Sequence, residues 1–463
     1  MAAVDRSTTA PAAALAVRMA RTLGEYSWPR LHAEVVAKAK LCIYDLLSSA
    51  LAAGELPWSR QAAAVARRNS QGCARGAGII GTSDVVSAQD AAFANGVLSH
   101  GLVRDDMHVG SVSHLGTVLV PTLLALAETT HVDGKAFLTA LVAGYEVGGK
   151  VGRMILDVEV AKIFRPTGTV GPIAAAAAGA KLLGLGPDQA TAALALAANT
   201  AAGYNEWAGT GGSEMFFHNG LAARSAVTAV ELAAAGAYAS PTALDGDAGI
   251  LAAFRRPRPP QVPELFADRP EILAVFFKPV PACNFAQTPA QVAHLLAQRH
   301  GLRADDIESV TVRVTRAAAL YPGCDVSGPF EHILQAKMSI HYNVAAALAH
   351  GNFAEQNYVP QQNAAVQALA KRVRVEIDAG FTAAFPGQQG AAVVVRTRDG
   401  QSFEHSAPNL VPTGADEVHE RFFAAAAAQR GEPQARELDA AIGTLETRGD
   451  AGELARLTRK RAP

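Results

Sequence analysis

Alanine and glycine dominate the most strongly helical stretches of this chain. Residues 169–203, TVGPIAAAAAGAKLLGLGPDQATAALALAANTAAG, contain a run of five alanines between glycines. Alanine loses no side-chain entropy in a helix, so such runs favour helix over strand. Because alanine and glycine let neighbouring helix backbones approach closely, the sequence predicts a tightly packed helical bundle.

The first 260 residues have the pattern of helices joined by short loops. Apolar residues recur with helical spacing, and Ser87 is placed to cap the start of one helix. Residues 169–203 are expected to form a helical hairpin, in which Gly184 or Gly186 ends one helix and Pro187 begins the next. The other predicted helices cover residues 34–53, 86–102 and 133–155.

The pattern changes near residue 255. Residues 255–270, RRPRPPQVPELFADRP, contain five prolines and are typical of a domain boundary or connecting arm. Beyond them, alternating apolar and polar residues predict strands, and the sequence RDGQ marks the turn of a hairpin. The predicted strands cover 309–314, 372–378 and the hairpin 391–406, with a helix over 336–351 and further helices from about 414.

These patterns predict a mostly α fold with two domains, as expected for a chain of 463 residues. A large all-helical domain is expected over residues 1–265, completed by residues 408–463. A smaller α+β lid domain, residues 266–407, is expected to be inserted between these two parts.

The composition argues against several classes of protein. The net charge is −1, from 41 basic and 42 acidic residues, whereas a nucleic-acid partner requires a clustered basic face. The apolar runs are interrupted well before the roughly 20 residues that span a bilayer, so no membrane segment is expected. The first residues lack a continuous apolar core, and the four cysteines show no CxxC spacing. These features predict a reduced, cytoplasmic protein.

Two apparent nucleotide motifs do not fit their structural context. Residues 144–151, GYEVGGKV, match GxxxxGK, but Val151 stands where a P-loop needs Ser or Thr, and the segment lies within a predicted helix. The glycines of residues 208–215 do not complete GxGxxG and follow a helix. We therefore expect no nucleotide cofactor.

The most polar loop of the helical region is LVRDDMHVGSVSHLG, residues 102–116, which carries two aspartates and two histidines. It permits three interpretations. The side chains could hold a metal, although no second histidine pair stands nearby to complete the ligand set. They could form an acid/base or substrate-binding site. Finally, Asp105 or Asp106 could cap the following helix, with the histidines as ordinary surface residues.

Three further stretches place polar groups at helix starts or between prolines. They contain Arg165 and Thr167 in FRPTGTVGP, Glu214 and His218 in SEMFFHNGLAARSA, and Lys278 and Cys283 in FFKPVPACNFAQTP. Together, Arg104, Arg165 and Lys278 would make a local cationic pocket on a nearly neutral protein. A di- or tricarboxylate substrate requires such a pocket.

Several stretches, in order, resemble the MmgE/PrpD family, which includes 2-methylcitrate dehydratase, cis-aconitate decarboxylase and iminodisuccinate epimerase. The similarity extends over residues 30 to 350. It implies a helical domain with a lid domain, a homodimer, and cofactor-independent chemistry in the cleft between the domains. The similar stretches are AAFANGVLSHGL, DDMH, HLGTVLVPTLLALAE, GYEVGGKVGR, RPTGTVGPIAAAAAGAKLLGL, FHNGLAARSAVTAVELAAAGAYA, FKPVPACN and AKMSIHYNVAAAL.

The resemblance also implies site residues. His114 matches the histidine of the family's HPG-like loop, Lys278 matches the lysine before the lid, and Tyr342 matches a helix tyrosine. Asp105 and Asp106 match the paired aspartates of the family. The chain departs from the family pattern at Val103, Met107, Arg165, Met215 and near Cys283.

The family resemblance leads to a mechanistic hypothesis. His114 transfers a proton at a carbon α to a carboxylate, while Lys278 and Arg165 bind carboxylates. Tyr342 or His218 acts as general acid, and Asp105 orients a histidine. The remaining residues expected to bind substrate are Arg104, Asp106, His108, Thr167 and Cys283, with no metal and no cofactor.

The favoured reaction is dehydration of a 2-methylcitrate-like di- or tricarboxylic acid. Epimerisation or decarboxylation of a related polycarboxylate is the first alternative. A non-catalytic carboxylate-binding member of the family and a metal-dependent hydrolase built on the DDxH residues are the others.

Overall fold

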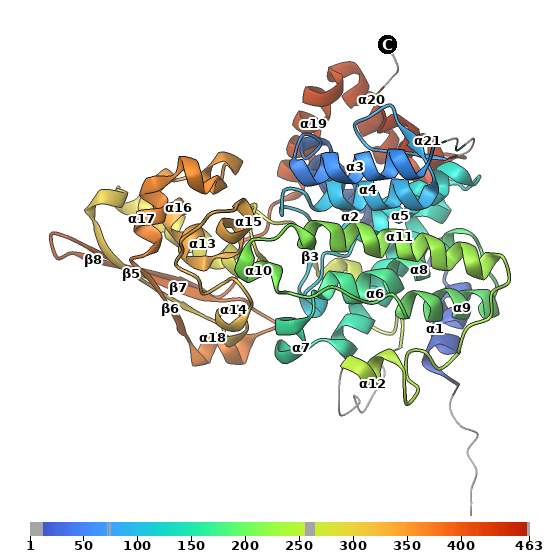
Figure 1. Ribbon diagram of the computed structural model, residues 1–463, viewed down its shortest axis with the longest axis horizontal. Coiled ribbons are helices and arrows are strands. Elements are labelled where there is room, and N and C mark those ends of the chain that lie inside the picture. The colour runs from blue at the N-terminus through green and yellow to red at the C-terminus, as the bar shows by residue number, and fades with distance from the viewer. Residues whose placement is uncertain (1–12, 72, 74–75, 255–263, 461–463) are drawn as a thin grey trace, which may run out of the picture.

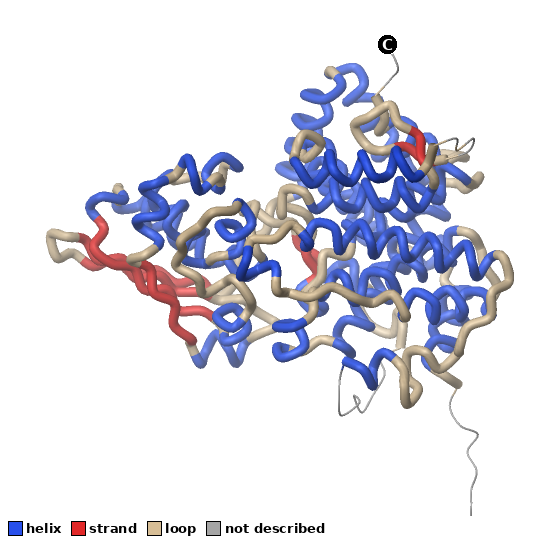
Figure 2. The backbone as a smooth tube through the Cα atoms, viewed as in Figure 1, coloured by secondary structure: helices blue, strands red, loops and turns tan. Residues whose placement is uncertain are grey.

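The structure is a computed structural model that describes residues 13–71, 73, 76–254 and 264–460. It confirms the mostly α fold. Figure 1 shows a large helical domain beside a smaller domain that holds the main sheet, and Figure 2 shows that most of the strand residues lie in this smaller domain. Most of the proline-rich segment predicted as a boundary, residues 255–263, lies outside the described residues.

The helical domain combines the N-terminal half of the chain with its C-terminal end (Figure 1). Its N-terminal helices are α1 (Leu15–Glu25), α2 (Ala33–Ala52), α3 (Pro57–Asn69), α4 (Ala88–His100), α5 (Gly116–Thr129), α6 (Gly134–Ile155), α7 (Val158–Ile163), α8 (Pro166–Leu182), α9 (Pro187–Ala198), α10 (Trp207–Thr210), α11 (Glu214–Ala234) and α12 (Ile250–Phe254). Its C-terminal helices are α19 (Ala415–Arg430), α20 (Glu432–Gly443) and α21 (Gly452–Leu457).

Small residues bring the central helices into close contact, as the sequence predicts. Helices α4 and α11 meet at Gly96 and Gly220, where a Cβ on Gly96 would lie 2.9 Å from the Cα of Gly220. A Cβ on Gly148 of α6 would lie 2.9 Å from the Cβ of Ala174 in α8. Real Cβ atoms do not approach this closely, so larger residues at either contact would separate the helices.

The local signals for helix ends in this domain are confirmed. The Ser87 side chain accepts a hydrogen bond from the backbone N–H of Asp90 and caps α4, and Pro187 is the first residue of α9. The GxxxxGK match lies within α6, so it forms no phosphate-binding loop. Among the described residues, no helix combines the length and apolar character needed to cross a membrane.

The smaller domain contains a four-stranded sheet in the order β6-β5-β7-β8. Strands β5 and β6 are parallel, whereas β7 pairs antiparallel with β5 and β8. Helices α13 and α16 contact each other, and they also contact β7 and β6 respectively. The elements are β5 (Ile307–Val314), β6 (Val373–Ile377), β7 (Ala391–Thr397), β8 (Ser402–Ala407), α13 (Gln287–His300), α14 (Arg316–Leu320), α15 (Ile333–Met338), α16 (Ile340–His350), α17 (Ala364–Ala370) and α18 (Ala379–Ala384).

One predicted helix of this domain is divided in two. The sequence predicts a continuous helix over 336–351, whereas α15 ends at Met338 and α16 begins at Ile340. Ser339 between them is extended, with φ −70° and ψ 124°, and its side chain accepts a hydrogen bond from the backbone N–H of Tyr342. The serine acts as an N-cap, because its side chain competes with the backbone for helical hydrogen bonds.

Two ladders of two residues lie outside the main sheet, and one of them connects segments that are distant in the sequence. Strand β3 (Met107–His108) pairs antiparallel with β4 (Val275–Phe276), and β1 (Ala77–Gly78) pairs with β2 (Val85–Val86). The chain just before β4 lies on α6, where the Glu146 carboxylate accepts hydrogen bonds from the backbone N–H groups of Phe266 and Glu271 at 2.7 and 2.9 Å. The polar loop 102–116 is thereby held beside the segment that carries Lys278.

Candidate active site

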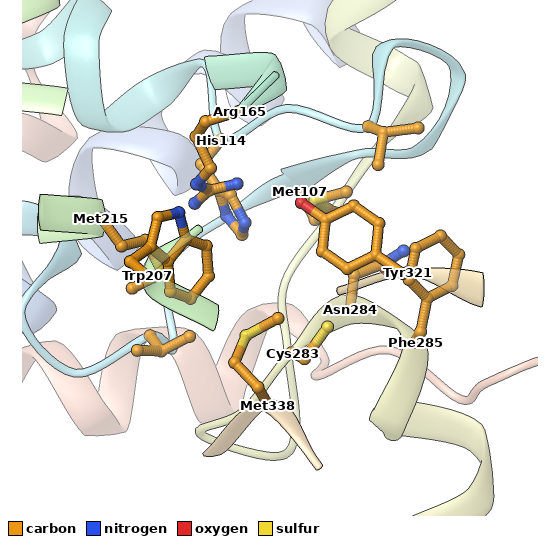
Figure 3. A pocket seen from close by; sticks show the side chains of 12 residues that line it. Met107, His114, Arg165, Trp207, Met215, Cys283, Asn284, Phe285, Tyr321 and Met338 are labelled. Atoms are coloured by element: carbon orange, nitrogen blue, oxygen red, sulfur yellow. The ribbon is translucent and has the colours of Figure 1, made fainter. Parts of the chain in front are cut away.

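A small cavity lies where the two domains meet (Figure 3). Its volume of about 20 Å³ leaves room for little more than one water molecule, so a larger ligand requires its walls to move. The helical domain and the loops joined to it contribute Val103, Met107, Val112, His114, Arg165, Trp207 and Met215. The smaller domain and the segment leading into it contribute Cys283, Asn284, Phe285, Tyr321 and Met338.

A continuous chain of buried polar side chains forms one wall of this cavity. The Arg165 guanidinium donates from Nη2 to His100 Nε2 at 2.9 Å, and His100 Nδ1 lies 2.9 Å from Asp105 Oδ1. The other carboxylate oxygen of Asp105 lies 2.7 Å from His114 Nδ1. Asp105 therefore contacts two imidazoles. One of them, His100, accepts from Arg165, which is the only arginine among the described residues that line the cavity.

The hydrogen-bond partners determine which nitrogen of each ring carries the proton. Arginine can only donate, so His100 Nε2 accepts and His100 Nδ1–H donates to Asp105. His114 Nδ1 faces two acceptors, the Asp105 carboxylate and, at 3.0 Å, the backbone carbonyl oxygen of Asp106. It therefore carries the proton, and Nε2 of the neutral His114 ring keeps a free lone pair.

Burial and charge set the protonation of this chain. Burial, aided by the Lys278 cation, outweighs Asp105 and lowers the pKa of His114 to about 3. Burial alone would raise the pKa of Asp105, but His100, His114 and Lys278 hold it well below its usual value. At neutral pH the empty site therefore contains an ionised Asp105 and a neutral His114 that can act as a base.

Arg165 has donor capacity left for a ligand. It begins α8 as the N-cap residue and is only 4 % exposed. Its Nε is buried without a hydrogen-bond partner among the described residues, and the guanidinium carbon lies 5.9 Å from the centre of the Trp207 ring. A buried donor without a partner is costly, so this atom indicates a missing acceptor such as a carboxylate oxygen.

Two strained valines border the polar loop. Val103 and Val112 have positive φ values of 59° and 46°, which β-branched residues rarely adopt, and both line the cavity. The Lys278 ammonium group holds the first of them in place by donating to the backbone carbonyl of Val103, and it donates to that of Ala282 at 3.2 Å. Such strain gathers at functional sites, where the surrounding structure maintains it.

Lys278 and Thr167, both predicted as site residues, act behind the cavity wall. Lys278 is fully buried, and burial lowers its pKa even though Asp105 opposes this effect. Its hydrogen bonds go to the two backbone carbonyls, so its positive charge acts on Asp105 and His114 through space. The Thr167 hydroxyl accepts from the backbone N–H of His114 at 3.0 Å and fixes the position of that residue.

The other polar residues of the loop 102–116 point away from the cavity. Asp106 accepts from the Tyr145 hydroxyl at 2.6 Å, and burial raises its pKa to about 8. His108 Nε2 lies 2.8 Å from Glu271, and Arg104 donates to the Ser48 hydroxyl at 3.0 Å. Neither aspartate caps the next helix, because α5 begins at Gly116 without a side-chain cap.

The two predicted general acids do not line the cavity. Tyr342 is buried within the smaller domain, where its hydroxyl donates to the backbone carbonyl of Asn357 at 2.9 Å. His218 lies in the first turns of α11, and burial and Arg165 lower its pKa to about 4. Cys283 does line the cavity, with its Sγ 3.7 Å from that of Cys324.

Sequence reasoning missed two residues of the site. His100 is the last residue of α4 and lies only five positions before Asp105, so its place at the end of a predicted helix was an available signal. Tyr321 follows the short helix α14, where no motif marks it. Figure 3 shows its hydroxyl directed toward the nitrogens of His114 and Arg165. Burial raises the pKa of Tyr321 to about 12, so this hydroxyl is protonated.

The metal interpretation requires a different arrangement of the loop. The residues of the DDxH sequence point to separate partners, so they do not form one ligand set. His100, Asp105 and His114 do place three potential ligand atoms within 4.8 Å of one another. However, these atoms already face one another across N–H to carboxylate contacts of 2.7 and 2.9 Å, with Arg165 adjoining. This arrangement fits a proton-transfer chain better than a cation site.

Comparison with known proteins agrees with this geometry. The chain is 27% identical to the human cis-aconitate decarboxylase over 395 residues, which are 81% of this chain and 80% of that protein. It is 35% identical over 180 residues to the cis-aconitate decarboxylase-like protein oryM of Aspergillus oryzae, a match that covers 37% of each chain. It is also 29% identical to the cis-aconitate decarboxylase of Aspergillus terreus over 199 residues, 42% of this chain and 40% of that protein.

Two family models account for most of the sequence. The MmgE/PrpD N-terminal domain matches residues 17–263, and the MmgE/PrpD C-terminal domain matches residues 280–444. The first match falls on the helical domain and contains His100, Asp105, His114 and Arg165. The second contains Cys283, Phe285 and Tyr321 on the facing wall. The chain therefore belongs to the MmgE/PrpD family.

Proposed function

We propose that this protein is a lyase that acts on a small di- or tricarboxylic acid by proton transfer at a carbon next to a carboxylate. One observation carries the proposal: His114, whose Nδ1 is engaged and whose Nε2 is left for proton transfer, lines the same buried cavity as Arg165, whose Nε has no partner among the described residues. A proton-transferring imidazole and a carboxylate-binding arginine in one site are what this chemistry requires.

The side chains have separate roles in the proposed reaction. Arg165 binds a substrate carboxylate through Nε, while its Nη2 donates to His100. Asp105 keeps His114 in the tautomer that presents Nε2 to the cavity. Tyr321 adds a neutral hydroxyl donor from the opposite wall. The proposed steps use only these groups.

Among the lyase reactions, we favour decarboxylation over the dehydration that the sequence alone suggested. The relatives reported above are named cis-aconitate decarboxylases or decarboxylase-like. In addition, most of the cavity lining is apolar, with three methionines, two valines, Trp207 and Phe285. A carboxylate held against apolar side chains loses hydration, and this favours the transition state for loss of carbon dioxide, in which the negative charge is spread over more atoms.

The decarboxylation balances with His114 as the proton carrier. Binding of a polyanion raises the pKa of His114, because the imidazolium form then gains a negative neighbour. The bond between the carbon chain and one carboxylate breaks, and carbon dioxide leaves. The electron pair of that bond passes into the carbon chain, where a proton from His114 Nε2 forms the new C–H bond. Solvent supplies the proton that His114 Nε2 takes up when the polyanion binds, and the ring is neutral again after the transfer.

Dehydration is the second candidate, supported by the Tyr321 hydroxyl in the same cavity. In that reaction, neutral His114 removes the proton at the carbon next to the carboxylate. Tyr321 protonates the hydroxyl that leaves as water. If the proton instead returned to the opposite face without elimination, the reaction would be an epimerisation.

We propose that the smaller domain acts as the lid of this site, and that the protein is a homodimer. Cys283, Phe285 and Tyr321 approach the cavity from the smaller-domain side, and the cavity is too small to admit a polycarboxylate without opening. The dimer is supported by apolar side chains that remain exposed on α11, Leu221 at 49% and Leu232 at 47%.

Proton and carbon NMR in D₂O tests the proposed reaction. Wild-type protein and the His114→Gln variant are incubated with cis-aconitate, citrate, 2-methylcitrate, iminodisuccinate and malate. We expect loss of carbon dioxide, with one deuterium entering the product, for an unsaturated polycarboxylate, and no product from the variant. Loss of water or exchange alone would replace decarboxylation by dehydration or epimerisation. Binding without any reaction would leave a non-catalytic carboxylate-binding protein, and no response to the whole panel would overturn the proposal.

A further inference from the structure

A second cavity adjoins the candidate active site. Its volume is about 230 Å³, and it shares Val112, Phe285 and Tyr321 with the first cavity, so these three side chains form a common wall. Phe285 lies 5.2 Å from the Tyr321 ring and 6.0 Å from the Phe385 ring, measured between ring centres. Phe385 lines only the second cavity, so the three rings extend from one cavity into the other.

This second cavity is apolar. Beyond the common wall, its lining includes Leu156, Val158, Ala161 and Ala317, with Phe385 and Pro386. Asp157 is the one charged residue among those that line it. Its side chain is exposed and accepts a hydrogen bond from the backbone N–H of Val160 at 2.9 Å, which caps α7. Among the described residues, the lining beyond the common wall therefore offers no cationic side chain to a carboxylate.

The active-site cavity itself offers few partners to a tricarboxylate. Of the described residues that line it, Arg165 is the only one with a cationic side chain, because the Lys278 ammonium group is committed to backbone carbonyls behind the wall. Val103, Met107 and Met215 occupy much of the remaining surface. A ligand that matches both cavities has its carboxylates at one end and an apolar group at the other.

Building on the proposed function, we propose that the substrate is a polycarboxylic acid that carries an alkyl or aryl substituent larger than methyl. The carboxylate end lies at Arg165 and His114, and the substituent occupies the second cavity, whose volume of about 230 Å³ exceeds the needs of a methyl group. Movement of Tyr321 or Phe285 joins the two cavities when the ligand binds. The substrate class is thus a polycarboxylate whose substituent is longer than the methyl group of 2-methylcitrate.

Binding of substituted succinates tests this inference without requiring turnover. Methyl-, butyl- and hexylsuccinate are titrated calorimetrically into wild-type protein and into the Ala317→Leu variant, which fills the second cavity. Ala319→Leu is the matched control, because Ala319 lies on the same helix but lines neither cavity. Each methylene group buried in the second cavity should tighten binding by roughly fourfold.

We expect the affinity to rise with the length of the alkyl chain in wild type and in Ala319→Leu. In Ala317→Leu this rise should be lost, while the affinity for methylsuccinate stays unchanged. Affinity that stays constant or falls with chain length in wild type would overturn the inference and leave the proposed function intact. An equal gain in the Ala317→Leu variant would also overturn it. If methylsuccinate binds no better to wild type than to Arg165→Gln, the carboxylate site itself is wrong, and the proposed function fails first.

Discussion

The two walls of the active-site cavity differ in chemistry and in how they are held. The helical wall carries a chain of buried polar contacts from Arg165 through His100 and Asp105 to His114. Thr167 accepts from the backbone N–H of His114, and Lys278 holds the turn at Val103. The wall from the smaller domain is mainly apolar, with Phe285 and Met338, and adds the single hydroxyl of Tyr321. We therefore propose a division of roles, in which the helical domain determines the reaction and the smaller domain determines closure and the shape of the substrate.

His114 gives the most severe test of this division. Replacing it by Gln removes the proton-transferring Nε2, and we expect kcat to fall by about 10²- to 10⁴-fold, since general acid–base catalysis typically contributes that much. The measurement is product formation by the proposed reaction, with circular dichroism to verify folding. His218→Gln is the control, because His218 does not line the cavity, and its kcat should stay within a few-fold of wild type. Equal losses of kcat in the His114 and His218 variants would contradict the proposed roles of the two walls.

Arg165 tests the recognition part of the same wall. Arg165→Lys keeps a positive charge but loses Nε and the planar fork, so we expect kcat/KM to fall by roughly 10- to 100-fold, mainly through KM. Arg104→Lys is the matched control, since the Arg104 hydrogen bond goes to Ser48 instead of the cavity. A substrate held chiefly by the smaller domain would leave KM of the Arg165 variant unchanged.

The two tyrosines of the smaller domain should respond in opposite ways. Tyr321→Phe removes the hydroxyl directed at His114, and we expect kcat to fall about tenfold as a proton donor is lost. Tyr342→Phe leaves the carbonyl of Asn357 without its donor, so it should lower the free energy of unfolding by about 1–2 kcal/mol with kcat unchanged. Kinetics and thermal unfolding of both variants show which tyrosine acts in the reaction and which one stabilises the fold. A loss of kcat confined to Tyr342→Phe would reverse these two roles.

The sequence predicted the helical scaffold more accurately than the site. Periodicity, Ser87 and Pro187 are local signals, and each produced the expected helix start. Asp105 and Asp106 are adjacent and chemically identical, yet one joins two imidazoles and the other binds Tyr145. Their directions depend on the turn at Val103 and on helices from distant parts of the chain.

The residues that were missed or misplaced reveal the same limit. Tyr321 reaches the cavity because the smaller domain packs against the helical domain, a contact that no local pattern encodes. Tyr342 was assigned a role by resemblance, but the Ser339 cap begins a new helix and directs the tyrosine into the interior of the smaller domain. Family similarity located the region of the site, whereas tertiary packing determined which of its residues face the cavity.

The smallest predicted effect concerns Asp106, which lies behind the helical wall. Burial raises its pKa to about 8, so the folded protein holds a proton that the unfolded chain releases above its ordinary pKa near 3.8. Its contribution to stability is therefore present at low pH and is lost as the pH rises from about 4 to 8. Asn resembles the protonated carboxyl group and does not titrate. We measure the midpoint temperature of thermal unfolding at pH 5 and at pH 8. The decrease between these two pH values should be a few degrees smaller in Asp106→Asn than in wild type.

Asp105→Asn provides the contrast for that measurement. Because the pKa of Asp105 is held well below its usual value, its ionised form stabilises the folded state throughout pH 5 to 8. This variant should therefore unfold at a lower temperature than wild type at every pH in that range. The slope of its unfolding midpoint temperature against pH should change little. Parallel slopes for wild type and Asp106→Asn would mean that Asp106 is ionised in the folded protein. The helical wall would then contain two adjacent buried negative charges, and Lys278 would have to balance both of them.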